Sequence, residues 1–326
     1  MRASRREFIV AATSALAGAS LPAMAQQKGF PSKSITIVVP YSPGGNIDTM
    51  GRTLAVPLGK ELGQSVLVDN RAGGGGAIGT TMVARAEPDG HTLLLTTTGQ
   101  FATLPQMIPT SYKASDFEPI CIASKTPMLL VARKNDTRFK NIAEFVKFAK
   151  SSPRGVNAGH AGPGTINHLA LLQLETAVGA HINAIAYRGS GPALVDLLSG
   201  QIDIVLDQVT SSMPHIKAGT LQALAIMSPD ADPALPGVPS LKQAGLPAFD
   251  ATTYLAVLAP AKTPAAVIAT LLPALKKSIA DPSLEKSLKE LGSAPHFAES
   301  SVFRNLVKTE EALSAQLIRD GRLKPE

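Results

Sequence analysis

The sequence predicts an α/β protein made of two lobes, and three observations lead to this prediction. Short apolar runs alternate with amphipathic helical patterns from residue 34 onward, as in strands joined by helices. The same alternation starts again near residue 128. The last part of the chain contains essentially one strand followed by helices, which cannot form a sheet alone, so it must add to an existing lobe.

The first α/β unit contains three strands and two helices. The run SITIVV is apolar on both faces, which is typical of a buried parallel strand. The helix after it ends at Gly63, and Pro57 inside it is expected to kink or split it. Strands alternating with helices predict a βαβαβ unit with right-handed crossovers. The expected strands are 34–39, 65–69 and 91–97, and the expected helices are 47–62 and 77–86.

The second unit repeats this pattern over residues 128–227. Ser190 is a candidate helix cap, Pro192 suits a first helical turn, and Gly200 ends that helix. The expected strands are 128–132, 156–158, 182–187, 202–207 and 221–227, and the expected helices are 141–152, 165–177, 190–199 and 213–218.

The tail decides how the lobes are connected. Residues 228–239 are polar and rich in proline, which indicates a connecting segment. One strand follows at 253–259, and two helices are expected to start at Thr263-Pro264 and Asp281-Pro282. If the tail returns to the first lobe, the chain crosses twice and a cleft lies between the lobes. We expect lobe 1 to comprise residues 26–122 and 227–326, and lobe 2 to comprise residues 123–226.

Residues 1–25 have the features of a cleavable export signal. Arg5 and Arg6 are followed by Phe8, a short apolar stretch and an AMA sequence that ends at Ala25. This order is typical of a secretory signal peptide, and the arginine pair favours the twin-arginine route over the general secretory route. The apolar stretch is shorter than the roughly 20 residues of a spanning helix. We expect export and cleavage after Ala25.

Composition argues against several classes of function. The formal net charge is +6 and 4% of residues are aromatic, with no basic stripe of the kind that binds nucleic acid. The six histidines form no i, i+4 pair and no cluster with cysteine, so we expect no metal site. Cys121, the only cysteine, lies in an apolar run and is interpreted as a core residue. Neither a G-x-S-x-G elbow nor a Walker lysine is present.

Glycine-containing loops follow several predicted strands at their carboxyl ends. In the first lobe they span residues 41–46 and 96–99, and in the second lobe 159–165 and 187–191. Glycine lets backbone N–H groups approach a ligand, and a helix start offers unpaired donors and the positive end of its dipole. Ligands in open α/β sheets bind beyond these strand ends. The loops favour an anionic ligand in the cleft, although ordinary capped turns have the same composition.

Four blocks of the sequence carry a family resemblance. They are PSKSITIVVPYSPGGNIDTMGRTLA, LGQSVLVDNRAGGGGAIGTTMVARAEPDGHTLLLTTTG, YRGSGPALVDLLSGQIDIVLDQ and ALPGVPSLKQAGLP. In this order they resemble the substrate-binding proteins of tripartite tricarboxylate transporters, the Bug family, over essentially the whole mature chain. The resemblance implies a type II-like periplasmic binding protein whose lobes close over a small carboxylate and deliver it to integral-membrane permease subunits. We expect a periplasmic monomer without cofactor or catalytic activity.

The resemblance also implies where the ligand binds. It assigns the loop 41–49 in the first lobe and the loops 160–167 and 188–191 in the second, with backbone amides and bridging waters in place of an arginine clamp. Asn46 or Asp48 should cap the first helix, and Asp48 is expected to be a cap rather than a ligand contact because it would repel an anion. The expected ligand-binding residues are Tyr41, Ser42, Gly44, Gly45, Asn46, Asp48, Thr97, Thr98, His160, Gly162, Thr165, Arg188, Gly189, Ser190 and Asp207.

His160 and Pro57 depart from the family pattern. A protonatable donor at His160 could pair with a ligand carboxylate. The alternative is a partly exposed loop histidine without a ligand role.

Two other classes of function compete with a binding protein. The segment Gly74-Gly75-Gly76-Ala77-Ile78-Gly79 satisfies G-x-G-x-x-G between a strand and a helix, which suggests an exported nicotinamide-dependent oxidoreductase. The acidic residue expected at the end of the next strand is missing, because that strand ends in three threonines. A scaffold protein would not need donor-rich loops on both lobes. Backbone donors accept any carboxylate, so the sequence leaves di- and tricarboxylates, amino acids and aromatic acids open.

Overall fold

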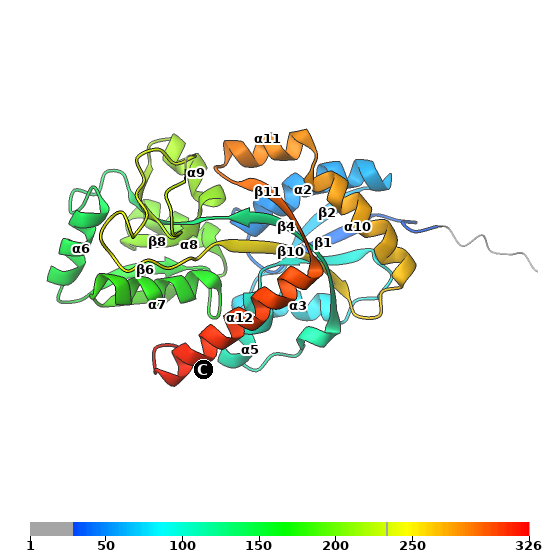
Figure 1. Ribbon diagram of the computed structural model, residues 1–326, viewed down its shortest axis with the longest axis horizontal. Helices are drawn as coiled ribbons and strands as arrows, with labels where there is room; N and C mark the ends of the chain where they lie inside the picture. Colours follow the sequence, from blue (N-terminus) through cyan, green and yellow to red (C-terminus); the bar gives the residue numbers. More distant parts are fainter. Residues whose placement is uncertain (1–28, 233, 326) are drawn as a thin grey trace, which may run out of the picture.

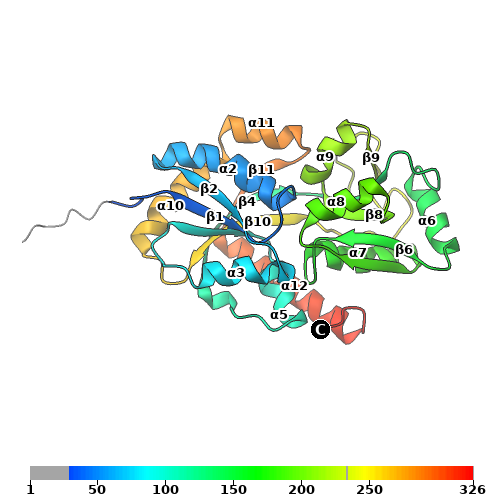
Figure 2. The ribbon, with the colours of Figure 1, turned by 180° about the vertical axis from the view of Figure 1, so that it is seen from behind.

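The computed structural model describes residues 29–232 and 234–325. The predicted export signal and its cleavage site at Ala25 lie outside these residues. The chain folds into two α/β lobes that lie side by side along the long axis of the molecule (Figure 1; Figure 2). No helix within the described residues is long and apolar enough to cross a membrane.

The first lobe is built on a six-stranded sheet with the order β11-β4-β10-β3-β1-β2. The strands β1, β2 and β3 pair in parallel, as the βαβαβ prediction requires, whereas β10, β4 and β11 pair antiparallel. The strands are β1 (Ile35–Val39), β2 (Val66–Asn70), β3 (Thr92–Thr96), β4 (Phe117–Thr126), β10 (Thr253–Pro260) and β11 (Ala294–Glu299).

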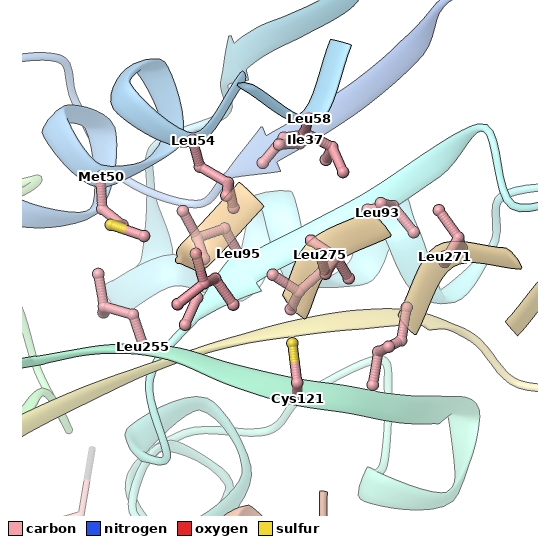
Figure 3. Close-up of a cluster of buried hydrophobic side chains, with 14 of the residues drawn as sticks. Ile37, Met50, Leu54, Leu58, Leu93, Leu95, Cys121, Leu255, Leu271 and Leu275 are labelled. Carbon is pink, nitrogen blue, oxygen red and sulfur yellow. The ribbon is translucent and has the colours of Figure 1, made fainter. Parts of the chain in front are cut away.

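Helices cover both faces of this sheet. On one face α2, α10 and α11 pack over a cluster that includes Ile37, Leu54, Leu95 and Leu275, and the thiol of Cys121 points into it (Figure 3). On the other face α3 and α12 pack over alternate strand residues such as Val38 and Leu94. The helices of this lobe are α2 (Asn46–Leu62), α3 (Ala77–Ala84), α4 (Gly99–Ala102), α5 (Leu104–Met107), α10 (Ala265–Ile279), α11 (Pro282–Glu290) and α12 (Ser300–Arg319), with 3-10 turns η1 (Gly74–Gly76) and η2 (Ala114–Asp116).

The second lobe is built on a five-stranded sheet with the order β7-β6-β8-β5-β9. The strands β6, β7 and β8 are parallel to one another, and β5 is antiparallel to β8. The elements of this lobe are the strands β5 (Met128–Arg133), β6 (Val156–His160), β7 (Ile182–Ala186), β8 (Ile204–Gln208) and β9 (Leu221–Ile226), and the helices α6 (Ile142–Ser151), α7 (Ile166–Val178), α8 (Ser190–Ser199) and α9 (Val209–Lys217).

The chain passes between the lobes twice, and both crossings come later than the boundaries predicted at residues 122 and 227. The first crossing falls after Thr126, because β4 continues in the first sheet to that residue. The second falls just before Thr253, because Leu241 and Ala251 pack into the core of the second lobe. The connecting segment 228–252 therefore belongs mainly to lobe 2.

Three expectations about single elements are corrected by the structure. The tail contains a second strand, β11, which lies at the edge of the sheet and is only half buried. The strand β4 was not predicted, since Pro119 interrupts its apolar run. Helix α2 continues through the buried Pro57, so the predicted split does not occur.

Candidate functional site

A small cavity lies between the two lobes. Its volume is about 30 Å³, room for two or three water molecules at about 10–15 Å³ each. Both lobes contribute to its wall, which is lined by Tyr41, Ser42, Gly45, Asn46, Ile47, Asp48 and Thr97 from lobe 1 and by Ala161, Thr165, Ile166, Asn167, Gly189, Ser190 and Gln208 from lobe 2. A ligand of several carbon atoms does not fit while the lobes are as close as in this structure, so binding it requires the lobes to lie further apart.

The first turn of α2 forms the lobe 1 side of the cavity. Gly45 is its N-cap residue and has extended backbone angles, and Asn46, Ile47 and Asp48 follow it. The N–H groups of a first helical turn have no acceptor within the helix, and the dipole makes this end positive. The turn therefore presents donors to an anion in the cavity.

Three helices of lobe 2 start at the same cavity. Thr165 caps α7 and accepts a hydrogen bond from the His168 N–H at 3.3 Å. Helix α8 begins at Ser190, directly after Gly189, whose φ of 135° needs a glycine. Gln208 is the N-cap residue of α9. With α2, four helix N-termini thus converge on one cavity, whose wall contains neither lysine nor arginine.

Asp48 stabilises the loop that precedes α2. Its Oδ2 accepts hydrogen bonds from the Gly44 N–H at 3.0 Å and from Nε of Arg52 at 3.1 Å. The Gly44 N–H is therefore paired within its own loop in this structure, and its role as a ligand donor stays a prediction. The Arg52 guanidinium also offsets the negative charge that Asp48 would otherwise direct at an anion.

Replacing Asp48 with alanine is expected to lower stability more than affinity. The change removes the acceptor of the Gly44 N–H and the carboxylate partner of Arg52, which keeps only its hydrogen bond to Oδ1 of Asn70. This should cost about 1–2 kcal/mol of unfolding free energy. Denaturant titration measures this loss, and Asp48→Asn is the matched control because it keeps an oxygen acceptor. An alanine variant as stable as the wild type would contradict this role.

The loops of the two lobes touch beside the cavity. The Ser42 N–H donates to the Arg188 carbonyl at 2.9 Å, while the Arg188 side chain is exposed. Arg188 therefore does not line the cavity, and its contribution is a backbone acceptor that holds the lobes together. At Gly191 the approach is closer still, because an added Cβ would lie 2.4 Å from the Pro43 carbonyl oxygen.

An interlocked pair of amides forms another part of the lobe 2 wall. Nδ2 of Asn167 donates to the Leu206 carbonyl at 2.8 Å, and Nε2 of Gln208 donates to Oδ1 of Asn167 at 3.2 Å. Gln208 also donates to Oγ1 of Thr253 at 3.0 Å, where the chain re-enters lobe 1. This wall is neutral and is tied to the interlobe connection.

The structure brings nine of the predicted site residues to the cavity wall and leaves six off it. Those on the wall are Tyr41, Ser42, Gly45, Asn46, Asp48, Thr97, Thr165, Gly189 and Ser190. Those off it are Gly44, Thr98, His160, Gly162, Arg188 and Asp207. Four further wall residues, Ile47, Ala161, Ile166 and Asn167, lie in the loops 41–49 and 160–167 assigned to the ligand but were not predicted individually. Sequence reasoning missed Gln208, which directly follows Asp207.

His160 is buried behind the wall. Its ring stacks on that of His168 at 4.4 Å between centroids, and its Nδ1 lies 3.0 Å from the Gly162 carbonyl. Burial and the neighbouring His168 lower the pKa of His160 to about 3, and burial lowers the pKa of His168 to about 4. Both rings are therefore neutral near pH 7, which argues against His160 as a charged partner for a carboxylate.

This histidine pair predicts acid-sensitive stability. Unfolded histidine has a pKa of about 6.5, so the unfolded chain takes up protons more readily than the folded one below that pH. Stability is complete above about pH 6.5 and falls as the pH drops toward 4, by about 2 kcal/mol per histidine at pH 5. Denaturant titrations at pH 7 and pH 5 measure the loss, which should be smaller in His168→Gln. An equal loss in both proteins would contradict this assignment.

Two other predicted residues serve structural purposes. The Asp207 carboxylate is completely buried and accepts hydrogen bonds from Ser211 and Ser212 at 2.6 and 2.5 Å. Burial raises its pKa, although these hydroxyls and that of Ser190 act in the opposite direction. Thr98 donates to the carboxylate of Glu310 on α12. Neither residue faces the cavity.

The Gly74–Gly79 segment is packed in a way that leaves no room for a dinucleotide. The Gly75 carbonyl accepts hydrogen bonds from the Tyr41 hydroxyl at 3.2 Å and from Nε2 of Gln100 at 3.1 Å. A Cβ at Gly75 would lie 2.5 Å from the Pro163 carbonyl oxygen of lobe 2. These glycines allow the two lobes to approach each other closely. This packing role explains the glycine run in place of the binding of a dinucleotide phosphate.

No group of three or more His, Cys, Asp or Glu side chains within residues 29–232 and 234–325 is arranged to hold a metal ion.

The hydroxyl of Ser190 lies at the buried Asp207 carboxylate and can rotate to donate to a ligand in the cavity. Ser190→Ala is therefore expected to weaken ligand binding by about 1 kcal/mol, or about fivefold. Ser190 lines the cavity at the start of α8 and is 6% exposed. Isothermal titration calorimetry measures the change, and Ser199→Ala at the exposed end of the same helix is the control. Unchanged affinity in Ser190→Ala would show that this hydroxyl does not contact the ligand.

Comparisons with known proteins place this chain among bacterial receptors. The sequence profile described as "Tripartite tricarboxylate transporter family receptor" matches residues 50–323. A UPF0065 protein of Pseudomonas sp. (strain P51) is 38% identical over 90% of this chain and 88% of its own length. Protein BugT of Bordetella pertussis is 32% identical over 98% of both chains.

Solved structures agree with this placement. The periplasmic binding protein BugD shares 32% identity with a TM-score of 0.84, covering 91% of this chain and 100% of its own. MatC from Rhodopseudomonas palustris with bound malate shares 30% identity with a TM-score of 0.81, covering 89% and 100%. R. palustris Rpa4515 with adipate shares 28% identity with a TM-score of 0.86, covering 91% and 100%.

Proposed function

The chain belongs to the tripartite tricarboxylate transporter family of receptors, and from this premise we propose that it captures a small dicarboxylate between its lobes and delivers it to a membrane permease. The receptor class and the binding of small carboxylates follow from the family. The choice of a dicarboxylate, the residues that bind it and the delivery to permease subunits are the proposal.

One observation carries the choice of an anionic ligand. Four helix N-termini, those of α2, α7, α8 and α9, converge on a cavity without lysine or arginine in its wall. Each helix end is equivalent to about half an elementary positive charge and offers backbone donors. Together they can stabilise negative charge without a cationic side chain.

The distribution of these helix ends favours two carboxylates rather than one. Helix α2 belongs to lobe 1, and the other three belong to lobe 2. An acid with a carboxylate at each end would bind both lobes simultaneously and so stabilise their closed arrangement. Malate and adipate, which are bound in two of the related structures, each have two carboxylates and are consistent with this choice.

The rest of the proposal concerns how the protein works in the cell. We assign it no catalytic role, since the cavity wall contains no nucleophile paired with a base. It acts in the periplasm as a monomer after removal of residues 1–25, and its permease partner recognises the closed, ligand-bound form.

A thermal-shift screen tests the proposed function. The panel contains malonate, succinate, malate, glutarate, adipate and citrate, with the diamide of each dicarboxylate as an uncharged control. A ligand at 100 times its Kd stabilises by about 2.7 kcal/mol, which raises Tm by several degrees. We expect a dicarboxylate, and not its diamide, to produce this shift. A shift with NADH and with none of the acids would support the oxidoreductase instead.

A further inference from the structure

Thr210 of lobe 2 and Asn46 of lobe 1 form a direct hydrogen bond across the cleft. The Thr210 hydroxyl donates to Oδ1 of Asn46 at 2.6 Å. Both residues are almost fully buried, with 2% and 4% of their surface exposed. Thr210 lies in the first turn of α9 and Asn46 begins α2, so the bond joins two of the helix N-termini that surround the cavity.

The other end of the Asn46 amide has no partner. Its Nδ2 is buried and makes no hydrogen bond within the described residues, while Asn46 lines the cavity. A buried donor left unpaired costs about 1–3 kcal/mol. A ligand carboxylate in the cavity would supply an acceptor for it.

We infer that Thr210 is a positioning residue for ligand binding, because its hydroxyl fixes the Asn46 amide so that Nδ2 faces the ligand. Oδ1 and Nδ2 point in different directions from the amide carbon. Holding Oδ1 toward α9 therefore turns Nδ2 away from α9, where it has no partner within the described residues. Thr210 itself does not line the cavity and makes no contact with a ligand there. The inference rests on the proposed binding of a carboxylate.

The bond also links ligand binding to closure. Its donor and acceptor belong to different lobes, so it forms only when the lobes are together. In the open protein the Asn46 amide loses this constraint and presents either end. Closure and the orientation of Asn46 therefore stabilise each other, and the bond should act mainly on the rate at which the ligand leaves.

Calorimetry and stopped-flow kinetics on four variants test this inference, with the tightest-binding acid of the dicarboxylate panel as the probe. Thr210→Val, which keeps the side-chain shape, should weaken binding about tenfold, equivalent to about 1.4 kcal/mol, mainly through faster dissociation. Thr210→Ser should restore affinity to within about twofold. In an Asn46→Ala background, Thr210→Val should have no further effect, as expected for two residues that act as a unit.

Thr263→Val is the matched control. Thr263 is also buried and donates a hydroxyl hydrogen bond, to the Pro260 carbonyl at 2.8 Å, but at the far end of β10 from the cleft. It should lower stability without changing affinity.

Three results would overturn the inference. They are wild-type affinity in Thr210→Val, failure of Thr210→Ser to restore binding, and an effect of Thr210→Val that persists in the Asn46→Ala background. Absence of binding by the wild-type protein to every acid would instead refute the proposed function, and this inference with it.

Discussion

Replacing Gly191 with alanine should prevent full closure of the lobes and weaken ligand binding at least about 100-fold. The added Cβ would lie 2.4 Å from the Pro43 carbonyl oxygen, a distance that no carbon and backbone oxygen tolerate. Since Pro43 belongs to lobe 1, the collision exists only when the lobes are together. Losing the donors of one lobe removes charge-assisted hydrogen bonds of about 1.5–3 kcal/mol each, so two such bonds account for the expected loss.

Small-angle X-ray scattering with and without the acid, together with calorimetry, measures this effect. The wild-type protein should become more compact on binding, whereas Gly191→Ala should not. Alanine before Pro192 carries a backbone cost of its own, so Gly99→Ala is a second variant, whose Cβ would lie 2.8 Å from the Gly164 carbonyl of lobe 2. Gly51→Ala is the control, because its Cβ would make ordinary contacts within lobe 1. Compaction and near-normal affinity in both cleft variants would contradict the closure mechanism.

Replacing Gly45 with valine should weaken binding about 100-fold while the protein still folds. The backbone of Gly45, with φ −91° and ψ 174°, suits any residue. A Cβ would lie 3.7 Å from Cβ of Ser190, an ordinary contact, but the two γ carbons of valine would extend into the cavity. They would keep a carboxylate away from the first turn of α2. The substitution at the N-cap should cost only about 1 kcal/mol of stability.

Gly45→Ala separates obstruction from other effects of losing the glycine. Its single Cβ has room beside Ser190, so binding should fall by no more than about fivefold. Calorimetry on both variants measures the difference. Valine and alanine variants of equal affinity would show that the ligand does not lie against Gly45.

Most helices and strands of both α/β units could be predicted, because the spacing of apolar residues along each of them is visible in the local sequence. Residues 34–39 are mostly apolar and 142–151 keep one apolar helical face, and the structure has the expected elements there, β1 and α6. The edge strand β11 could not be predicted, since its sequence contains Pro295 and neither face is fully buried. Its pairing with β4 comes from a segment far away in the chain.

The boundary of lobe 2 was set too early for a related reason. Residues 228–239 have the composition of a linker, yet Leu235 within them and Leu241 just after them are buried in lobe 2. Composition describes the exposed turns of such a segment and does not reveal the few side chains that anchor it.

The candidate site could be predicted where backbone and helix starts define it, as at Gly45 and Ser190. It could not be predicted where side-chain direction decides. His160 and Arg188 lie in the expected loops, but one ring is buried behind the wall and the other side chain is exposed. Gln208 is held at the wall by hydrogen bonds to Asn167, which lies 41 residues earlier in the chain, and to Thr253, which lies 45 residues later. A local sequence pattern cannot reveal contacts at such separations.

A crystal structure of the complex with the tightest-binding dicarboxylate tests most directly whether the ligand is held by converging helix N-termini. One carboxylate should lie within hydrogen-bond distance of the first-turn N–H groups of α2 and of Nδ2 of Asn46, and the other should lie against the starts of α7 and α8. Both lobes should contact the acid, and they should lie further apart than in this structure by the room that the acid needs. An acid bound outside this cavity, or held by the guanidinium of Arg188 folded inward, would contradict it.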